Sequence, residues 1–489
     1  MGKKFILAGM SFGDEGKGTF VDYLTHKYGI KQIIRYNGGS QASHTVITPK
    51  QIVHKFSQMG SGMFLKDCKT YLSSNMVINP VNLIAEVIQF SKKTGLSQKE
   101  VLERIIIDEK CYIVTPYHSL MNKLRELSKG KERRGSVGTG VSEVNQLLRE
   151  KTFWSNGLGV QMKDLYDTKS LYEKIEDLHY CVKNFYMDNE EIIEDIFLNA
   201  DEIMGKELKS LDRQIEELFY KQNIEQLCNT YQSFITDKRF NICKDIGEVL
   251  QPNEDIIFEG SQGLLLDEVY GTKPNTTILD TTIKNALHIV EAMKVVKEEP
   301  DSSEVVKIGI AKAFASRHGA GVFPTEDAST SYSIRDNNQE KSFWMGQMRF
   351  GWFDAVLMRY AQSINNVDEL YLSSVDKLRF IQTIKICNKY IYTGNVDEGF
   401  KTMFEYENKN DSIIVHNIRN NQGNISKYLM QCKPVYIGLN GFGEDMSEAR
   451  CKDDLPVNCL NYIALIERLT GIRVSLISVG PTRDEKVEL

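Results

Sequence analysis

The segment FGDEGKG, residues 12–18, combines glycines with charged residues in a way that suits phosphate chemistry. Its members are Gly13, Asp14, Glu15, Gly16, Lys17 and Gly18. A glycine-rich turn presents backbone N–H groups that hold a phosphate, and a lysine adds positive charge. Two carboxylates would repel that phosphate unless a metal ion or the reaction uses them. The segment therefore predicts a nucleotide site with a reactive carboxylate; the alternative is an ordinary strand-to-helix turn with solvated charges.

A second polar loop, NGGSQASHTV at residues 37–46, carries the histidine best suited to catalysis. Gln41, Ser43 and His44 precede Thr45 and a β-branched apolar pair. A histidine between a polar loop and a strand can act as a general acid or base near neutral pH. The alternative is a histidine with only a structural role in a turn.

A third loop, RRGSVGTG at residues 133–140, places two arginines before glycines and hydroxyl groups. Arg133, Arg134 and Ser136 with the surrounding backbone donors suit a dianion. We interpret this loop as a second phosphate site, with a plain surface loop as the alternative.

Strands and helices in alternation must position these loops. Apolar runs at Phe5–Ala8, Ile256–Phe258 and Val305–Ile310 predict strands, and a polar loop follows each of them. Helices are predicted at Asn79–Gly95, which opens with Asn-Pro, and from Asp354. In an open parallel sheet such loops meet at the carboxyl edge, where ligands bind. The predicted fold class is α/β, with a mainly parallel central sheet flanked by helices.

The stretch from Lys163 to Glu248 has a different pattern. Apolar residues recur there at three- and four-residue intervals between charged ones, which is typical of packed helices. We interpret residues 160–250 as a helical insertion or subdomain within one domain that spans residues 1–489.

Composition excludes several classes of function. A net charge of −6 over 489 residues argues against nucleic-acid binding as the main task. No run of about 18 apolar residues is present, so no membrane span or membrane partner is expected, and the N-terminus does not read as a signal peptide. Nine scattered cysteines without a C-x-x-C pair fit reduced thiols and a cytoplasmic location.

Taken together, these motifs resemble the adenylosuccinate synthetase family. The matching segments, in the family's order, are FGDEGKG, NGGSQASHTV, GSVGTG, EGSQGLLLDEVYGTKP, KAFASRHGAGVFPTE, GWFDAVLMRYA, SSVD and LTGIRVSLISVGP. They span nearly the whole chain, from Phe5 to Arg483. The helical region between Arg149 and Glu259 is longer than the family usually has.

The resemblance implies a reaction in which GTP and Mg²⁺ join aspartate to IMP, giving adenylosuccinate, GDP and phosphate. Asp14 would remove the purine N1 proton and ligate Mg²⁺, with a backbone carbonyl from Ser43. His44 would act as the acid while the γ-phosphoryl group moves to the purine O6. Lys17 would hold the phosphates in transfer. A carboxylate, an imidazole and a lysine suit this chemistry, because phosphoryl transfer depends on positioning and charge neutralisation.

The resemblance also assigns the binding residues. For GTP they are Gly13, Glu15, Gly16, Lys17, Gly18, His44, Thr45, Asp376, Gly480 and Pro481. For the purine monophosphate they are Asp14, Gln41, Ser136, Arg149, Gln262 and Thr277. Arg149 falls where the family has an arginine that crosses to a neighbouring subunit, which implies a homodimer.

The chain departs from the family pattern in two ways that affect substrates. Ser374 replaces the lysine of the guanine clamp T-K-x-D, so the preference for GTP is less secure. The aspartate loop T-T-G-R is replaced by Trp344–Phe350, whose remaining candidates are Gly346, Gln347 and Arg349. Arg349 is then expected to meet a carboxylate, with Arg317 compensating in part.

Two smaller departures lie in the purine and phosphate loops. Gln41 and Ser43 replace the family's asparagine and glycine, and the phosphate motif is shortened to Ser136-Val137. Asp14 is retained, which favours a purine without a 2-amino group, such as IMP or dIMP.

Three hypotheses follow. The first is a GTP-dependent C–N ligase on a purine monophosphate, with aspartate as the expected donor and another small amine as the alternative. The second is a non-catalytic purine-nucleotide sensor, favoured by the altered amine loop. The third is a scaffold that acts through the helical region.

Overall fold

The computed structural model describes residues 2–130, 133, 135, 136, 138–150, 158–199, 202–220, 222–237, 239–297, 304–334, 344, 346–419 and 423–489. Arg134, Val137 and Met345 from the predicted loops lie outside these residues. Within the described ranges, no helix combines the length and the apolar character needed to cross a membrane.

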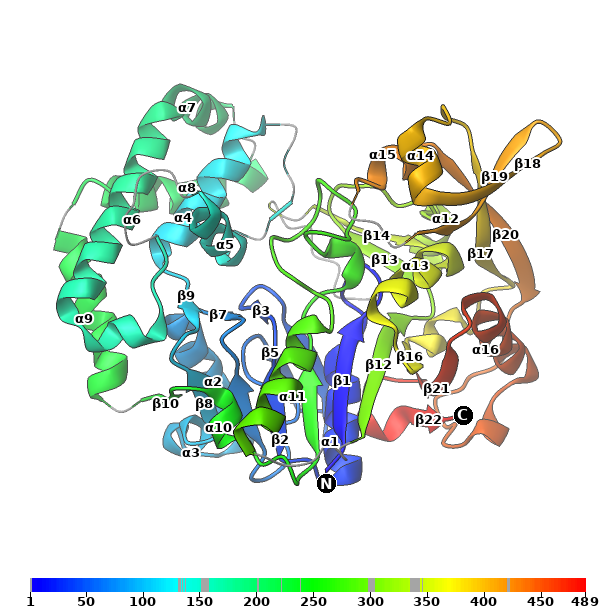
Figure 1. Cartoon of the computed structure of the whole chain (residues 1–489), viewed down its shortest axis with the longest axis horizontal. Helices are drawn as coiled ribbons and strands as arrows, with labels where there is room; N and C mark the ends of the chain where they lie inside the picture. Colours follow the sequence, from blue (N-terminus) through cyan, green and yellow to red (C-terminus); the bar gives the residue numbers. More distant parts are fainter. Residues whose placement is uncertain are drawn as a thin grey trace.

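A ten-stranded sheet forms the centre of the molecule (Figure 1). In spatial order its strands are β10 (Asn241–Cys243), β8 (Ile105–Asp108), β6 (Lys69–Leu72), β2 (Gln32–Arg35), β11 (Ile256–Glu259), β1 (Lys4–Gly9), β12 (Val305–Lys312), β16 (Glu369–Ser373), β21 (Arg473–Ser478) and β22 (Lys486–Glu488). Each neighbouring pair is parallel except β21 with β22. The predicted α/β class with a mainly parallel sheet is confirmed.

Helices cover both faces of this sheet because β1 is apolar on both sides. Phe5 and Leu7 pack against α1 (Lys17–Tyr28), whereas Ile6 and Ala8 pack on the side of α11 (Lys284–Lys297). The other helices around the sheet are α2 (Pro80–Thr94), α3 (Gln98–Leu102), α10 (Ile246–Val249), α13 (Ala355–Asn365) and α16 (Val457–Thr470). The predicted caps are present: Asn79 accepts a hydrogen bond at the start of α2, and Asp354 does so at the start of α13.

Smaller sheets extend from the carboxyl edge. One hairpin pairs β4 (His44–Ile47) with β5 (Val53–Phe56), and another pairs β13 (Ala315–His318) with β14 (Met348–Gly351). A three-stranded sheet joins β3 (Gly38–Gly39), β7 (Met76–Ile78) and β9 (Tyr112–Ile113).

A five-stranded sheet forms the β lobe, drawn at the right of Figure 1. It holds β15 (Phe353–Asp354), β17 (Thr383–Tyr392), β18 (Phe404–Lys409), β19 (Ser412–Ile418) and β20 (Cys432–Asn440). Three short helices accompany these outer elements: α12 (Ala328–Ser333), α14 (Glu398–Met403) and α15 (Ser426–Leu429).

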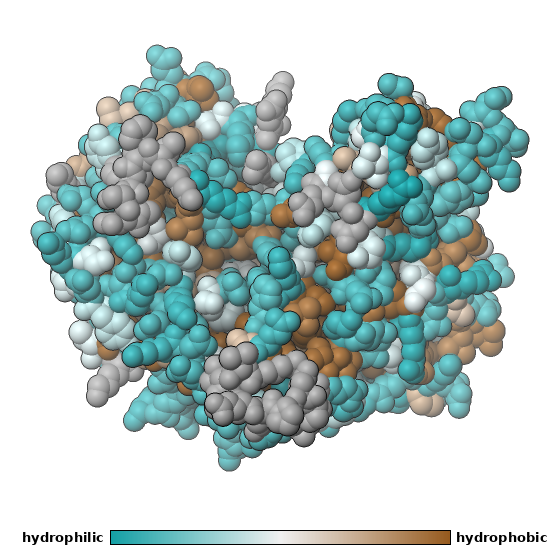
Figure 2. All heavy atoms as spheres, in the orientation of Figure 1, coloured by the Kyte–Doolittle hydropathy of each residue, from teal (hydrophilic) through white to brown (hydrophobic). Residues whose placement is uncertain are grey.

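The helical lobe lies at the left of Figure 1. It contains α4 (Pro116–Ser128), α5 (Val141–Arg149), α6 (Thr168–Asp188), α7 (Glu190–Leu198), α8 (Glu202–Glu217) and α9 (Gln222–Thr236). Its buried side chains share one apolar core with α2, β6 and β8. The space-filling view shows a notch between this lobe and the β lobe (Figure 2).

Candidate active site at the carboxyl edge of the sheet

The first loop, between β1 and α1, is folded around the buried carboxylate of Glu15. Its Oε1 accepts hydrogen bonds from the backbone N–H groups of Ser11 (2.6 Å) and Gly13 (3.4 Å), and its Oε2 is 2.8 Å from the Lys17 Nζ. Gly16 caps α1 with a φ of 79°, a left-handed conformation that favours glycine. Glu15 therefore shapes the turn and pairs with Lys17.

Asp14 is the carboxylate of this loop that faces outward. Its side chain is 55% exposed, and its Oδ2 is 2.9 Å from the Nζ of Lys312 at the end of β12. The same ammonium donates to the Ser316 hydroxyl in β13 at 3.2 Å. Burial of the surrounding cleft opposes ionisation, but the charge and hydrogen bond of Lys312 outweigh it, and the pKa of Asp14 is lowered. Asp14 is a carboxylate at neutral pH.

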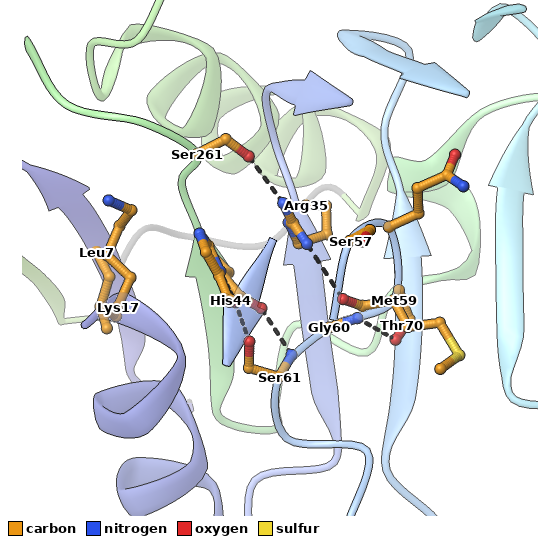
Figure 3. Close-up of polar contacts among 12 residues, drawn as sticks. Leu7, Lys17, Arg35, His44, Ser57, Met59, Gly60, Ser61, Thr70 and Ser261 are labelled. Atoms are coloured by element: carbon orange, nitrogen blue, oxygen red, sulfur yellow. Dashed lines mark hydrogen bonds and ion pairs between the residues drawn. The ribbon is translucent and has the colours of Figure 1, made fainter. Parts of the chain in front are cut away.

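His44, at the start of β4, is buried and oriented by a second carboxylate. Its Nδ1 is 2.5 Å from Oε1 of Glu259, the last residue of β11. Glu259 also accepts hydrogen bonds from the backbone N–H of Ser61 (2.9 Å) and from the Ser61 hydroxyl. Figure 3 shows His44 between Lys17 and the buried Arg35 of β2.

Burial lowers the pKa of His44 to about 4, although Glu259 acts in the opposite direction. The imidazole is therefore neutral at neutral pH, and its Nδ1–H donates to Glu259. For Glu259, burial is outweighed by Arg35 and His44, which lower its pKa to about 2. A carboxylate that fixes Nδ1 leaves Nε2 as the reactive nitrogen.

Lys17 connects the two predicted catalytic groups. Its positive charge contributes to lowering the pKa of Asp14 and the pKa of His44. A Cβ atom added at Gly18 would lie 2.8 Å from the Cβ of His44, so the first turn of α1 packs directly on β4. Lys17 thus lies near both Asp14 and His44, and the catalytic roles of the three residues stay a prediction.

Several buried polar atoms in and near the predicted loops have no hydrogen-bond partner within the described chain. They are the Ser40 Oγ, both amide atoms of Gln41, the His44 Nε2, the Gln262 Oε1 and the Ser373 Oγ. Buried polar groups are normally paired, so such a group of unpaired atoms at strand ends indicates a site that a polar ligand completes.

The residues predicted for the purine lie around the same cleft. Gln262 adopts a left-handed conformation (φ 60°), and a Cβ added at Gly13 would be 3.5 Å from its Cα. A Cβ added at Gly39 would be 3.0 Å from the Gln41 Oε1. Thr277 lies 3.3 Å, oxygen to oxygen, from the Ser142 hydroxyl in α5. The segment after β11 thus contacts the first loop at Gly13 and the first turn of α5 at Ser142.

The predicted phosphate loop is held by α4. The Ser136 hydroxyl donates to the Asn122 Oδ1 at 2.8 Å, and the Gly135 and Ser136 N–H groups point to Glu126 Oε2 at 3.0 and 3.4 Å. Two backbone donors that the sequence analysis assigned to a dianion are thus bonded to a carboxylate in this structure. The Ser136 hydroxyl is likewise taken by Asn122.

The residues predicted for the guanine base lie at the other end of the first loop. A Cβ added at Gly16 would be 3.1 Å from the Cβ of Ser373. Asp376 is buried in a 3-10 turn, Val375–Leu378, three residues beyond the end of β16. Burial raises the pKa of Asp376. The turn at Gly480 and Pro481 is fixed by the Thr19 hydroxyl, which donates to the Pro481 carbonyl at 3.0 Å.

Ser43 and Thr45 flank His44 and are exposed, whereas His44 is buried. The alternation follows the period of the strand. Ser43 directly precedes His44, whose Cβ lies against Gly18 of the predicted triphosphate loop.

The two arginines that were expected to meet a carboxylate are engaged inside the protein. Arg349 forms a two-pronged ion pair with Glu326, with Nε–Oε1 at 2.8 Å and Nη2–Oε2 at 2.5 Å, and its Nη1 donates to two backbone carbonyls. Arg317 is 1% exposed, and burial lowers its pKa to about 9. Both arginines thus have partners within the chain, and their role in holding a substrate carboxylate stays a prediction. Gly346 and Gln347 are exposed.

Arg149 forms an ion pair with Glu268 of the same chain. Its side chain is 56% exposed at the end of α5. The predicted contact with a neighbouring subunit stays a prediction, because the structure holds a single chain.

Comparison with known proteins identifies the family. Residues 6–487 match the family model described as adenylosuccinate synthetase. This chain belongs to the adenylosuccinate synthetase family. It is an adenylosuccinate synthetase-like ligase that acts on purine nucleotides.

Named adenylosuccinate synthetases match along nearly their whole length. The Exiguobacterium sibiricum enzyme is 29% identical over 99% of this chain and 97% of its own, and the Bacillus subtilis enzyme is 27% identical over 98% and 96%. A fully ligated adenylosuccinate synthetase from Plasmodium falciparum shares the fold with a TM-score of 0.74, at 20% identity and full coverage of both chains.

A more distant structure also shares the fold. The succinoaminodeoxyadenylate synthetase of cyanophage S-2L, bound to dGMP and to dATP as an energy donor, gives a TM-score of 0.52 at 12% identity. The match covers all of this chain and 95% of the cyanophage enzyme.

Sequence reasoning about this adenylosuccinate synthetase family member missed two residues, Glu259 and Lys312. Both lie at strand ends, where a charged residue after a buried strand is a usable signal. Their partners, His44 and Asp14, are 215 and 298 residues away along the chain. A single sequence offers no sign of such pairings.

Proposed function

We propose that this protein is a GTP-dependent C–N ligase that activates the O6 of IMP by phosphorylation and joins an amine to C6. The products are the N6-substituted nucleotide, GDP and phosphate. With aspartate as the amine, the product is adenylosuccinate.

The observation that carries this proposal is the set of unpaired buried polar atoms at Ser40, Gln41, His44, Gln262 and Ser373. Gln262, Ser373 and His44 lie against Gly13, Gly16 and Gly18 of the first loop, so three of these residues, from three different loops, surround the turn that is suited to phosphates. The hydroxyl, amide and imidazole atoms of this set include both hydrogen-bond donors and hydrogen-bond acceptors. A nucleotide base needs both, and its phosphates need donors.

Asp14 and His44 have the chemistry that the reaction needs. An ionised, outward-facing carboxylate can accept the N1 proton of the purine, which makes O6 nucleophilic. His44 is neutral, and Glu259 holds its Nδ1. As negative charge develops on the transferring phosphoryl group, Nε2 can take up a proton from water and hold it against that charge, and Glu259 stabilises the resulting imidazolium.

The site also fits the Mg²⁺ that the family implies. Mg²⁺ is commonly held by one or two protein oxygens together with substrate phosphates. Asp14 supplies an exposed carboxylate, and Ser43, the residue before His44, would supply a backbone carbonyl. When bound, the ion would neutralise charge on the triphosphate. No cluster of three or more His, Cys, Asp or Glu side chains in the described residues suggests a different metal site.

Isotope exchange separates purine activation from amine transfer. GTP labelled with ¹⁸O at the β–γ bridge is incubated with IMP and Mg²⁺ without an amine. Reversible transfer of the γ-phosphoryl group to O6 would move label from the bridge to nonbridging positions of the β-phosphate. Asp14→Asn should lower this exchange by ~10²–10⁴-fold, since it removes the base. Asp67→Asn is the matched control, because Asp67 is also exposed and left-handed (φ 62°) but is not in the cleft.

The same measurement tests the sensor hypothesis, which the engaged Arg349 favours. Tight binding of IMP and GTP without IMP-dependent exchange would support a sensor and contradict the ligase. Replacing IMP with dIMP in the assay would show whether the ribose 2′-hydroxyl matters.

The remaining proposals concern assembly and location. We propose a homodimer in which Arg149 leaves Glu268 and reaches the partner's purine phosphate. All nine cysteines are unpaired, which agrees with a reducing compartment such as the cytoplasm.

A further inference from the structure

The hairpin of β13 and β14 lies next to the proposed reaction centre. Lys312, at the end of β12, donates both to Asp14 (2.9 Å) and to Ser316 in β13 (3.2 Å). An amine that attacks C6 must approach beside the N1 atom that Asp14 serves. The hairpin therefore lies beside the path that the second substrate would take.

Arg349 in β14 has little capacity left to bind a substrate. Four of its N–H groups donate, two to Glu326 and two to the carbonyls of Gly319 (3.1 Å) and Gly321 (2.8 Å). Its guanidinium also lies 5.4 Å from the ring centre of Phe323. A guanidinium offers five N–H donors, so at most one remains, and Glu326 neutralises its charge.

Arg317, opposite Arg349 in the hairpin register, is likewise engaged. It donates to the carbonyls of Ala320, Val322 and Asn275 and to the Thr272 hydroxyl, at 2.7 to 3.1 Å. It lies 4.4 Å from the ring centre of Phe12 and is almost fully buried. Releasing it would leave four acceptors without a partner, which is costly in a buried site.

The end of the connection, directly before β14, is uncharged where it is described. Gly346 and Gln347 are exposed, and Trp344 packs against the apolar core of the helical lobe. An amide forms neutral hydrogen bonds, which are about half as strong as those of a guanidinium with a carboxylate. A dicarboxylate would also add negative charge near Asp14, Glu326 and the triphosphate.

We infer that the amine donor of this enzyme is a small amine without a side-chain carboxylate, and that Gln347 sets this preference. The inference rests on the proposed function. In the reaction, the amine nitrogen forms a bond to C6 and the C6–O6 bond breaks. O6 leaves with the γ-phosphorus as phosphate, and an amine proton leaves with it.

Aspartate and asparagine provide a matched pair of donors, because they differ only in the side chain, which ends in a carboxylate in aspartate and in a carboxamide in asparagine. The full-length protein is assayed with IMP, GTP and Mg²⁺ by mass spectrometry of the nucleotide products. The panel adds glycine, alanine and ammonia. Asparagine or another panel member without a side-chain carboxylate should have a kcat/KM about tenfold or more above that of aspartate. The reason is that Gln347 offers a side-chain carboxylate only neutral hydrogen bonds, which are weaker than those of an arginine. Hydroxylamine, a small and reactive nucleophile, reports purine activation whatever the donor specificity.

A charge introduced at one position tests Gln347 directly. Gln347→Arg should raise kcat/KM for aspartate by about tenfold, relative to the hydroxylamine rate of the same variant. Gln382→Arg adds the same charge at an exposed position before β17, away from the hairpin, and should leave the donor preference as it is.

The outcomes separate this inference from the proposed function. If hydroxylamine reacts and aspartate is the best donor, or equals the others, the inference is wrong and the ligase assignment stands. If hydroxylamine reacts and no panel member without a side-chain carboxylate is used, the inference is again wrong. If nothing reacts, hydroxylamine included, both fail.

Discussion

His44 and Glu259 form the contact on which the proposed chemistry depends most. The imidazole Nδ1 and the carboxylate Oε1 are 2.5 Å apart, and both side chains are buried. The carboxylate fixes the tautomer of the neutral ring and stabilises the imidazolium that forms when Nε2 takes a proton. Glu259 thus acts through His44 and is a positioning residue.

Replacing Glu259 with Gln should lower kcat by about 10²-fold and change the KM for GTP little, because the neutral amide cannot stabilise an imidazolium. The pH profile of kcat should change with it, since Glu259 is the group that raises the pKa of His44 against burial. Steady-state kinetics across pH would measure both effects.

Glu86→Gln is the matched control for that variant. Glu86 is also a buried carboxylate, and it accepts backbone hydrogen bonds from Ser57, Gln58 and Met59 without contacting His44. It should lose stability but keep the pH profile. Equal losses of kcat in both variants, with unchanged profiles, would show that Glu259 only supports the fold.

His54 has no catalytic role in the proposed mechanism and carries a cost for the fold. It is fully buried among Phe56, Phe64 and Phe90, and neither ring nitrogen has a partner in the described chain. Burial lowers its pKa to about 4 from an ordinary 6.5. The folded state therefore binds fewer protons than the unfolded state between these two values.

His54→Phe should reduce the loss of stability in acid. Because the pKa of His54 is lower in the folded state than in the unfolded state, protonation favours unfolding. Its effect on the free energy of unfolding is absent above pH 6.5 and grows as the pH decreases towards 4, by ~1.4 kcal/mol per pH unit. Chemical denaturation at pH 7.5 and 5.0 should show a smaller drop in the free energy of unfolding for the variant, by about 2 kcal/mol. His288→Gln, at an exposed histidine, should match the unmodified protein. An equal drop in all three proteins would contradict the burial argument.

At the scale of residues, motifs predicted the members of the site better than their partners. Asp14, Lys17 and His44 stand in glycine-rich or polar loops after strands, so local pattern and chemistry together single them out. Arg349 shows the limit of this reasoning. Its charge is visible in the sequence, but its engagement by Glu326 depends on the folded hairpin.

Among the elements, those with strong local signals were predicted well. α2 and α13 begin at their expected caps, and β1, β11 and β12 include the apolar runs that indicated them. The strand order was not predicted, because β1 pairs with β11 and β12, which lie more than 200 residues further along the chain.

The element that most directly supports the purine phosphate loop is α4. One side of α4 packs Leu120 and Leu124 into the core shared with the helical lobe. Another side presents Asn122 and Glu126, which bond to Ser136 and to the backbone before it. The helix thus links the packing of residues 160–250 to the geometry of the loop.

Asn122→Ala should raise the KM for IMP by about tenfold while the KM for GTP stays the same, because the Ser136 hydroxyl loses its acceptor and the loop loses its fixed position. Ser128→Ala removes a hydroxyl that bonds only to Arg125 at the end of the same helix, and it serves as the control. Substrate titrations would measure both constants. A matching rise in the KM for GTP would indicate general disruption of the fold.

At the scale of the whole molecule, the helical lobe is continuous with the rest of the fold. Leu171, Leu211 and Tyr231 belong to the same apolar core as Phe90 and Ile107 near the sheet. Periodicity alone predicted helices in this region, but it contains no information about the surface against which they pack. The boundaries of a separate insertion at residues 160–250 remain a prediction.

The proposed dimer makes a quantitative prediction about mixed subunits. If Arg149 serves the partner's site, each site takes Asp14 from one subunit and Arg149 from the other. Asp14→Asn and Arg149→Leu homodimers would both be inactive. Random mixing makes half of the dimers hybrid, and each hybrid has one site with both native residues, so about a quarter of the unmodified activity should return.

The competing arrangement is the one that a single chain displays, with Arg149 paired to its own Glu268. If Arg149 acts only within its own chain, every site in a hybrid lacks one of the two residues, and mixing restores nothing. Size-exclusion chromatography with differently tagged subunits would verify that hybrids form. Hybrid formation without recovered activity would therefore exclude a shared site, whereas recovery near one quarter would require Arg149 to break its pair with Glu268 and cross the interface.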